Sequence, residues 1–107
     1  MISTDSSGFA ISAVLLQDQG NGLQPIEYHA RTMLPAEQNY PVHEQELLAV
    51  VEALKHWRCY LEACERFLIS TDHDTLKHFM KQQNLSARQA RWLEYISPYA
   101  NNMDIFL

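Results

Sequence analysis

The sequence predicts an α/β domain in which helices pack on a mixed β-sheet. Two apolar segments near the N-terminus are separated by a glycine-containing turn, a pattern typical of an antiparallel hairpin. A long segment with helical periodicity comes next, and a short apolar run typical of a buried strand follows it. Because a strand that follows a crossover helix usually lies parallel to its neighbour, the predicted sheet contains both antiparallel and parallel pairs.

The first 31 residues predict an antiparallel meander of three strands. A short first strand ends at Asp5, and a second strand covers residues 9–17, which are apolar and partly β-branched. Residues 18–22 form a turn with two glycines that can adopt positive φ, and residues 24–31 form the return strand.

A long helix is expected over residues 42–62, after a loop or short turn at residues 32–41 that is marked by prolines. The apolar residues of this segment recur at spacings of three and four, which is typical of a helix with one buried face. The stripe consists of Leu47, Val50, Leu54, Trp57 and Leu61.

The remainder of the chain predicts a strand, two helices and a last strand. Residues 66–71 form a short buried-type strand, and residues 74–81 form a short helix. Ser86 caps a second helix at residues 87–96, because a serine hydroxyl can accept a hydrogen bond from a free N–H of the first turn. Residues 103–107 resemble a final strand.

Composition indicates one ordinary globular domain. The chain has 107 residues, of which 47% are hydrophobic and 20% charged. A formal net charge of −5 argues against a basic nucleic-acid-binding tail, although bound cations would offset carboxylates that act as ligands. Two cysteines are too few for a disulfide scaffold, no apolar run approaches the roughly 20 residues that span a bilayer, and no secretory signal is visible. We therefore expect a soluble intracellular protein without a membrane partner.

Three acidic residues lie in contexts that suggest a metal site. Asp5 and Asp72 each follow a predicted strand, and Glu46 lies in the first turns of the long helix. If the first and fourth strands are parallel neighbours, their carboxyl ends meet at one edge of the sheet, where ligands usually bind. Carboxylates that converge there would need a cation between them, and Mg²⁺ prefers oxygen ligands. Such a site could hold two metal ions and cleave phosphodiesters.

Each carboxylate also has an ordinary structural explanation. Asp5 could be a turn residue. Glu46 could be an acid that the helix dipole favours near the N-terminus of its helix. Asp72 could be the N-cap of the helix that follows it.

A local excess of basic residues follows Asp72 and suits contacts with the phosphates of a substrate. This group supplies four of the eight basic residues in the chain: Lys77, Lys81, Arg88 and Arg91. A solvated helix face is the alternative for any one of them. His73, directly after Asp72, could contact a substrate or serve as a capping or surface residue.

Nearly the whole chain resembles the RNase H domain in the Pol polyproteins of gypsy-type LTR retrotransposons. The order and spacing of several segments carry the resemblance, including Thr-Asp-Ser-Ser-Gly at the start and His-Glu-Gln-Glu-Leu-Leu-Ala in the long helix. The matching segments are residues 4–17, 25–31, 37–49, 54–61, 71–76 and 86–94.

The resemblance implies an RNase H-like fold, with an antiparallel meander followed by parallel strands. It also implies that Asp5, Glu46 and Asp72 are the metal-binding catalytic residues, and it favours Glu46 over Glu44. Two Mg²⁺ or Mn²⁺ ions per site would then support cleavage of the RNA strand in an RNA–DNA hybrid, by in-line attack of water that leaves a 3′-hydroxyl. The resemblance implies that the polymerase domain of the same polyprotein is a partner. It also implies an intracellular location, in the cytoplasm, the nucleus or a virus-like particle of the parent element.

Several positions depart from the family pattern. Ser6, Ser12 and Ala30 replace small residues that are usual in the family, and these changes leave the carboxylates intact. The fourth acid of the family has no counterpart before Leu107, because Asp104 lies in a different context. We therefore expect residues 1–107 to be a single domain and a fragment of a larger polyprotein. The alternative functions are a truncated or domesticated module without catalysis, and a connection-type domain that braces a polymerase.

Overall fold

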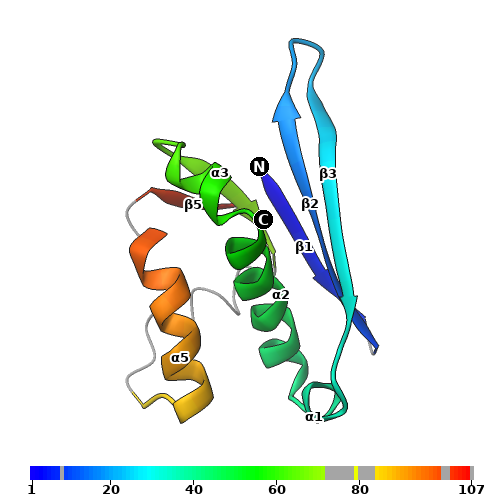
Figure 1. Cartoon of the computed structure of the whole chain (residues 1–107), viewed down its shortest axis with the longest axis vertical. Helices are drawn as coiled ribbons and strands as arrows, with labels where there is room; N and C mark the ends of the chain where they lie inside the picture. Colours follow the sequence, from blue (N-terminus) through cyan, green and yellow to red (C-terminus); the bar gives the residue numbers. More distant parts are fainter. Residues whose placement is uncertain (8, 72–78, 80–83, 100–101, 107) are drawn as a thin grey trace.

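Five strands form one mixed sheet in the computed structural model, which describes residues 1–7, 9–71, 79, 84–99 and 102–106. The spatial order is β3-β2-β1-β4-β5 (Figure 1). The pairs β3–β2 and β2–β1 are antiparallel, whereas β1–β4 and β4–β5 are parallel. This topology confirms the predicted meander and the predicted parallel strands. The strands are β1 (Ile2–Ser6), β2 (Ala10–Asp18), β3 (Leu23–Thr32), β4 (Phe67–Ser70) and β5 (Met103–Phe106).

The hairpin of β2 and β3 follows from its turn residues and from alternation along β2. Gly20 and Gly22 have φ of 97° and 95°, a region that residues with a Cβ rarely adopt. Every second residue of β2, namely Ile11, Ala13 and Leu15, is buried on the face that the helices cover. β3 is an edge strand, and most of its side chains are exposed.

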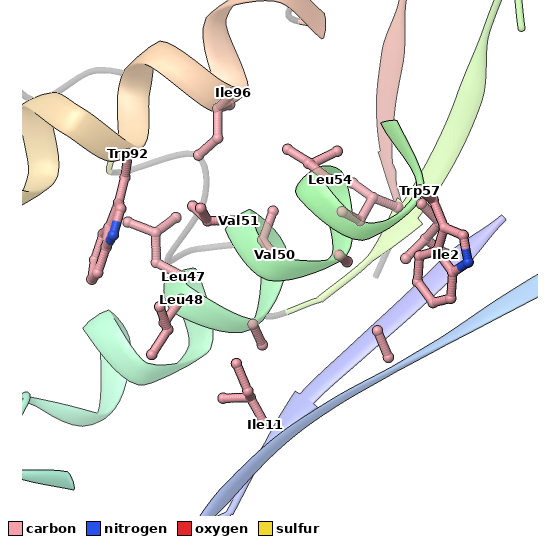
Figure 2. Packing of buried hydrophobic residues seen from close by; sticks show 14 of the residues in the cluster. Ile2, Ile11, Leu47, Leu48, Val50, Val51, Leu54, Trp57, Trp92 and Ile96 are labelled. Carbon is pink, nitrogen blue, oxygen red and sulfur yellow. The ribbon is translucent and has the colours of Figure 1, made fainter. Parts of the chain in front are cut away.

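Helix α2 lies on the sheet, and α5 packs against the other side of α2 (Figure 1). Because α2 is covered on two sides, most of its side chains are buried, and the buried residues are not confined to the single stripe that the sequence predicts. Figure 2 shows Val50 and Leu54 of α2 in the core that also contains Ile2 of β1 and Ile96 of α5. The helices are α1 (Pro35–Gln38), α2 (Val42–His56), α3 (Arg58–Glu62), α5 (Ala87–Ile96) and the 3-10 helix η1 (Ser97–Tyr99).

The single helix predicted for residues 42–62 is two helices, α2 and α3, which meet at Trp57. The backbone of Trp57 has φ of −104° and ψ of 25°, outside the helical range. Its indole is buried, and Nε1 donates a hydrogen bond to Glu27 Oε1 of β3 at 3.1 Å. The bend therefore accompanies a contact with a distant strand, which helical periodicity does not reveal.

The other predicted helices have different outcomes. The helix predicted for residues 87–96 matches α5, and Ser86 Oγ accepts a hydrogen bond from Gln89 N–H at 3.2 Å. The predicted loop at residues 32–41 contains the short helix α1. The helix predicted for residues 74–81 lies outside the range that the structure describes, except for residue 79. No helix among the described residues is long and apolar enough to cross a membrane.

Two histidines connect the edge strand β3 to the end of α2. The rings of His29 and His56 are stacked, with centroids 4.0 Å apart and an angle of 14° between the planes. His56 Nε2 lies 2.9 Å from Glu27 Oε1, and Glu27 also accepts the hydrogen bond from Trp57. Burial of the imidazole lowers the pKa of His29 below its usual 6.5, and the neighbouring charge of His56 lowers it further.

The stability of the domain should therefore fall as the solution is acidified through the usual pKa of histidine. The unfolded chain binds a proton at His29 more readily than the folded chain does. Neutral His29 therefore contributes to the free energy of unfolding above pH 6.5, and this contribution is lost as the pH falls toward the lowered pKa. Urea unfolding, followed by tryptophan fluorescence, measures the free energy of unfolding at each pH. Between about pH 7.5 and about pH 5.5 this free energy should decrease less in His29→Asn than in the parent chain. The control is His43→Asn, which changes an exposed histidine of α2. An unchanged pH dependence in His29→Asn would contradict the explanation.

Candidate functional site

The parallel pair of β1 and β4 creates the edge at which the predicted site lies. Ile2 pairs with Ile69, and Ser3 pairs with Ser70. The hydroxyl of Thr4 also donates a long hydrogen bond to the carbonyl oxygen of Ser70, at 3.5 Å. The strands are therefore neighbours that run in the same direction, and their carboxyl ends lie at the same edge of the sheet. This confirms the condition on which the sequence-based site depended.

Asp5 occupies this edge. It is an exposed residue of β1, and its backbone pairs with Ser12 of β2. Its Oδ1 accepts a hydrogen bond from the N–H of Ser6 at 2.9 Å, which orients the carboxylate near the end of the strand. An exposed carboxylate at a sheet edge is accessible to a large ligand and can bind a cation through oxygen.

Glu46 lies in the first half of α2 and is half-buried. The helix packs on β1 and β2, and it begins at the end of the sheet toward which β1 runs (Figure 1). Asp5 and Glu46 therefore belong to the corresponding ends of two elements that are in contact. The third predicted ligand, Asp72, lies outside the described residues, as do the candidate substrate-binding residues His73 and Lys77.

The donor types fit a hard divalent cation, because carboxylate oxygens are the ligands that Mg²⁺ and Mn²⁺ prefer. Within the part of the chain that the structure describes, no group of three or more acidic, histidine or cysteine side chains could hold a metal ion. Asp5 and Glu46 are two members of the predicted set, and the third is among the residues that are not described. The metal site therefore stays a prediction.

Glu44 has a separate role, which the structure reveals. Its side chain is buried, and it accepts hydrogen bonds from Arg88 Nη2 at 2.6 Å and from Gln89 Nε2 at 3.1 Å. The hydrogen bond to Glu44 raises the pKa of Arg88 above its usual value. The carboxylate of Glu44 thus binds α5 to the first turns of α2.

Arg88 was predicted to contact substrate, and the structure places it in this contact with Glu44. Its guanidinium carbon lies 3.8 Å from the ring centroid of Tyr40 and 5.8 Å from that of Trp92. The aromatic faces and the buried carboxylate hold the charge between α2 and α5. Sequence spacing could not identify the pair, because 44 residues separate the partners.

Arg91 has a different environment from Arg88, although both lie on α5. It is exposed, and no ion pair joins it to another described residue. The other described arginines each form an ion pair with a carboxylate, and Lys55 lies over the ring of Tyr95 at 4.4 Å. Among the described cations that were predicted to contact substrate, Arg91 is thus the one available for a phosphate.

The order and directions of the strands, with α2 packed on the sheet, define the class of the protein as an RNase H-like domain. A family model described as "RNase H-like domain found in reverse transcriptase" matches residues 1–99. The chain belongs to this family.

Two retrotransposon relatives extend the comparison. The chain is 36% identical over 98 residues to the retrovirus-related Pol polyprotein from transposon opus of Drosophila melanogaster, covering 92% of the chain and 10% of that protein. It is 36% identical over 103 residues to the transposon Tf2-3 polyprotein of Schizosaccharomyces pombe, covering 92% of the chain and 8% of that protein. The chain thus spans about a tenth or less of these relatives.

The solved structures agree with the fold. The foamy viral protease-reverse transcriptase in complex with dsDNA superposes with a TM-score of 0.73 at 15% identity, over 98% of this chain and 22% of that chain. A second structure, the dRH form of the same protein in complex with dsDNA, gives a TM-score of 0.72 at 16% identity, over 98% of this chain and 19% of that one. The RNase H-like mixed sheet predicted from the sequence is therefore confirmed.

Proposed function

We propose that this domain is a metal-dependent nuclease that cleaves the RNA strand of RNA–DNA hybrids. The observation that carries the proposal is the parallel register of β1 and β4, in which Ser3 pairs with Ser70. Asp5 lies two residues after Ser3 in the sequence, and Asp72 lies two residues after Ser70. If the register continues, two carboxylates face one edge of the sheet beside the start of α2, which carries Glu46.

The residues have distinct parts in the proposed mechanism. Asp5, Glu46 and Asp72 would hold two Mg²⁺ or Mn²⁺ ions through carboxylate oxygens. When bound, the ions would activate water and stabilise the leaving oxygen of an in-line displacement. Asp5 is exposed, so a long duplex can reach the site without opening the core. Arg91 supplies a positive charge on α5 for the phosphate backbone.

Hybrid cleavage in Mn²⁺ tests the proposal directly. The chain should cut the RNA strand of an RNA–DNA hybrid, and Asp72→Asn should remove this activity, because the substitution replaces a charged ligand with a neutral amide. RNA–RNA and DNA–DNA duplexes of the same sequence are the substrate controls. Equal cleavage by both chains would refute the assignment of Asp72, and cleavage by neither would refute catalysis by these 107 residues.

Arg91→Ala should weaken hybrid binding through the loss of one phosphate contact. The magnitude of the slope of log affinity against log salt concentration should decrease by about 1, because one fewer counterion is released. Fluorescence anisotropy with a labelled hybrid, at several salt concentrations, measures both quantities. Arg66→Ala is the matched control, since Arg66 forms an ion pair with Asp104. If both variants give the same slope as the parent chain, Arg91 does not contact a phosphate.

The polyprotein relatives support two further parts of the proposal. The chain covers a small share of proteins named as Pol or transposon polyproteins, so we infer that the polymerase domain of a reverse transcriptase is its covalent neighbour. An intracellular setting, including a virus-like particle of the parent element, follows from that inference. The structures of the foamy viral enzyme are described in complex with dsDNA, which supports a duplex nucleic acid as the substrate class.

A further inference from the structure

A partly buried polar network joins the first turns of α2 and α5, and Glu44 and Gln89 are its buried members. We call it the Glu44 bracket, and it consists of Glu44, Arg88, Gln89, Ser86 and Tyr40. The amide of Gln89 bridges the two helices, because Oε1 accepts the N–H of Ser86 at 3.1 Å while Nε2 donates to Glu44 Oε1. The other oxygen of the same carboxylate accepts from Arg88.

Burial makes this network intolerant of small changes. The side chain of Glu44 is 8% exposed, so its charge depends on these two donors rather than on water. Arg88 Nε has no hydrogen-bond partner among the described residues. The guanidinium contacts Glu44 through Nη2 and lies over the ring of Tyr40. Removing one member would leave a buried charge without its partner.

The bracket fixes a helix start that has no side-chain cap. The N-cap of α2 is Pro41, which forms no side-chain hydrogen bond to the first turn. The turn is instead held by tertiary contacts: Glu44 binds α5, and Gln45 Nε2 donates to the carbonyl oxygens of Glu37 and Gln38. Glu46 is the next residue along the helix.

We propose that Glu44 and Arg88 are positioning residues, which hold the first turns of α2 so that the carboxylate of Glu46 keeps one orientation toward the sheet edge. The inference rests on the proposed function, in which Glu46 is a metal ligand. Groups that orient a ligand without touching the metal typically change metal affinity by roughly 10- to 100-fold. The sequence motif His-Glu-Gln-Glu thus contains one positioning carboxylate and one ligand carboxylate.

Two variants of the bracket and one matched control test the proposal. Glu44→Gln removes the charge of the buried carboxylate, and Arg88→Lys keeps the charge while removing the planar guanidinium. Glu37→Gln is the control, because Glu37 is similarly buried at 10% side-chain exposure and forms a similar ion pair with Arg31 at 2.7 Å. Thermal unfolding curves of the three variants identify a temperature at which all of them are folded, and the measurements are made there. If Glu44→Gln does not fold, the test uses Arg88→Lys and the control.

The decisive readouts concern Glu46 itself. Three-bond scalar couplings in the metal-free chain report whether its χ1 angle is fixed, and Mn²⁺ titration by calorimetry reports affinity. Both bracket variants should show averaging of χ1 and bind Mn²⁺ roughly tenfold or more weakly, whereas Glu37→Gln should match the parent chain in both.

The outcomes separate this proposal from the proposed function. Couplings and affinities that change no more than in Glu37→Gln would overturn the positioning role, whatever the loss of thermal stability. Averaging of χ1 in the bracket variants supports it. If χ1 of Glu46 is fixed in the parent chain and averaged in the bracket variants, but the parent chain binds no Mn²⁺ at its carboxylates, the positioning role stands and the proposed metal-dependent function fails.

Discussion

Replacing Glu46 with glutamine should lower hybrid cleavage in Mn²⁺ by more than about 100-fold and leave the fold unchanged. Groups that only orient a ligand contribute roughly 10- to 100-fold, so the loss of a ligand itself should exceed that range. The amide keeps the size of the side chain and removes its negative charge, which a divalent cation requires. Initial cleavage rates and circular dichroism of the two chains measure activity and fold.

Glu52→Gln is the matched control for this experiment. Glu52 lies on the same helix, is also half-buried, and lies 3.2 Å from Arg31 rather than at the predicted site. Its substitution removes the same charge and should leave the cleavage rate within a few-fold of the parent chain. If both variants lose activity equally, the loss reflects the net charge of α2, and Glu46 is not a specific ligand.

Ile69→Ala should destabilise the domain by about 3 kcal/mol, the middle of the range for deleting a buried isoleucine side chain down to alanine. Ile69 is completely buried, and its strand β4 connects β1 to β5. The substitution removes the packing of the Ile69 side chain in the core and leaves a cavity, which the surrounding residues fill only in part. For a domain of this size the midpoint of thermal unfolding should fall by roughly 10 to 20 °C. Calorimetry measures the shift.

Leu68→Ala gives the comparison on the opposite face of the same strand. Leu68 is 42% exposed, so truncation removes less buried surface and should change stability by less than about 1 kcal/mol. Equal losses in the two variants would mean that both faces of β4 are covered equally, contrary to the structure. Because β4 leads to Asp72 in the sequence, Ile69→Ala should also reduce cleavage at temperatures near its unfolding midpoint.

The elements with strong local signals could be predicted from the sequence. Alternation of apolar residues and two glycines predicted the hairpin of β2 and β3, and Ser86 predicted the start of α5. These features depend on neighbouring residues, so a short window contains the required information. The strand after the long helix was also predicted to lie parallel to a neighbour, because crossover connections favour parallel strands. The structure identifies that neighbour as β1.

The features that were missed depend on contacts between distant residues. Trp57 interrupts the predicted long helix where its indole binds Glu27, 30 residues away. Arg88 was predicted to contact substrate, whereas the structure pairs it with Glu44, a buried carboxylate of another helix. Helical periodicity is the same for a cation that pairs with a distant carboxylate and for an exposed cation, so the sequence could not distinguish the two.

The residues alone were sufficient to predict the order of the strands along the chain, the mixed sheet and the family, and to select Asp5, Glu46 and Asp72 as candidate ligands. Which charges are free to act depends on how the helices pack. The tertiary structure placed Arg88 with Glu44 and left Arg91 exposed. The physical reason is that local patterns follow from backbone geometry, whereas the partner of a charge depends on which helices pack together. A buried carboxylate must find its donors there, and in this domain Glu44 finds them on α5.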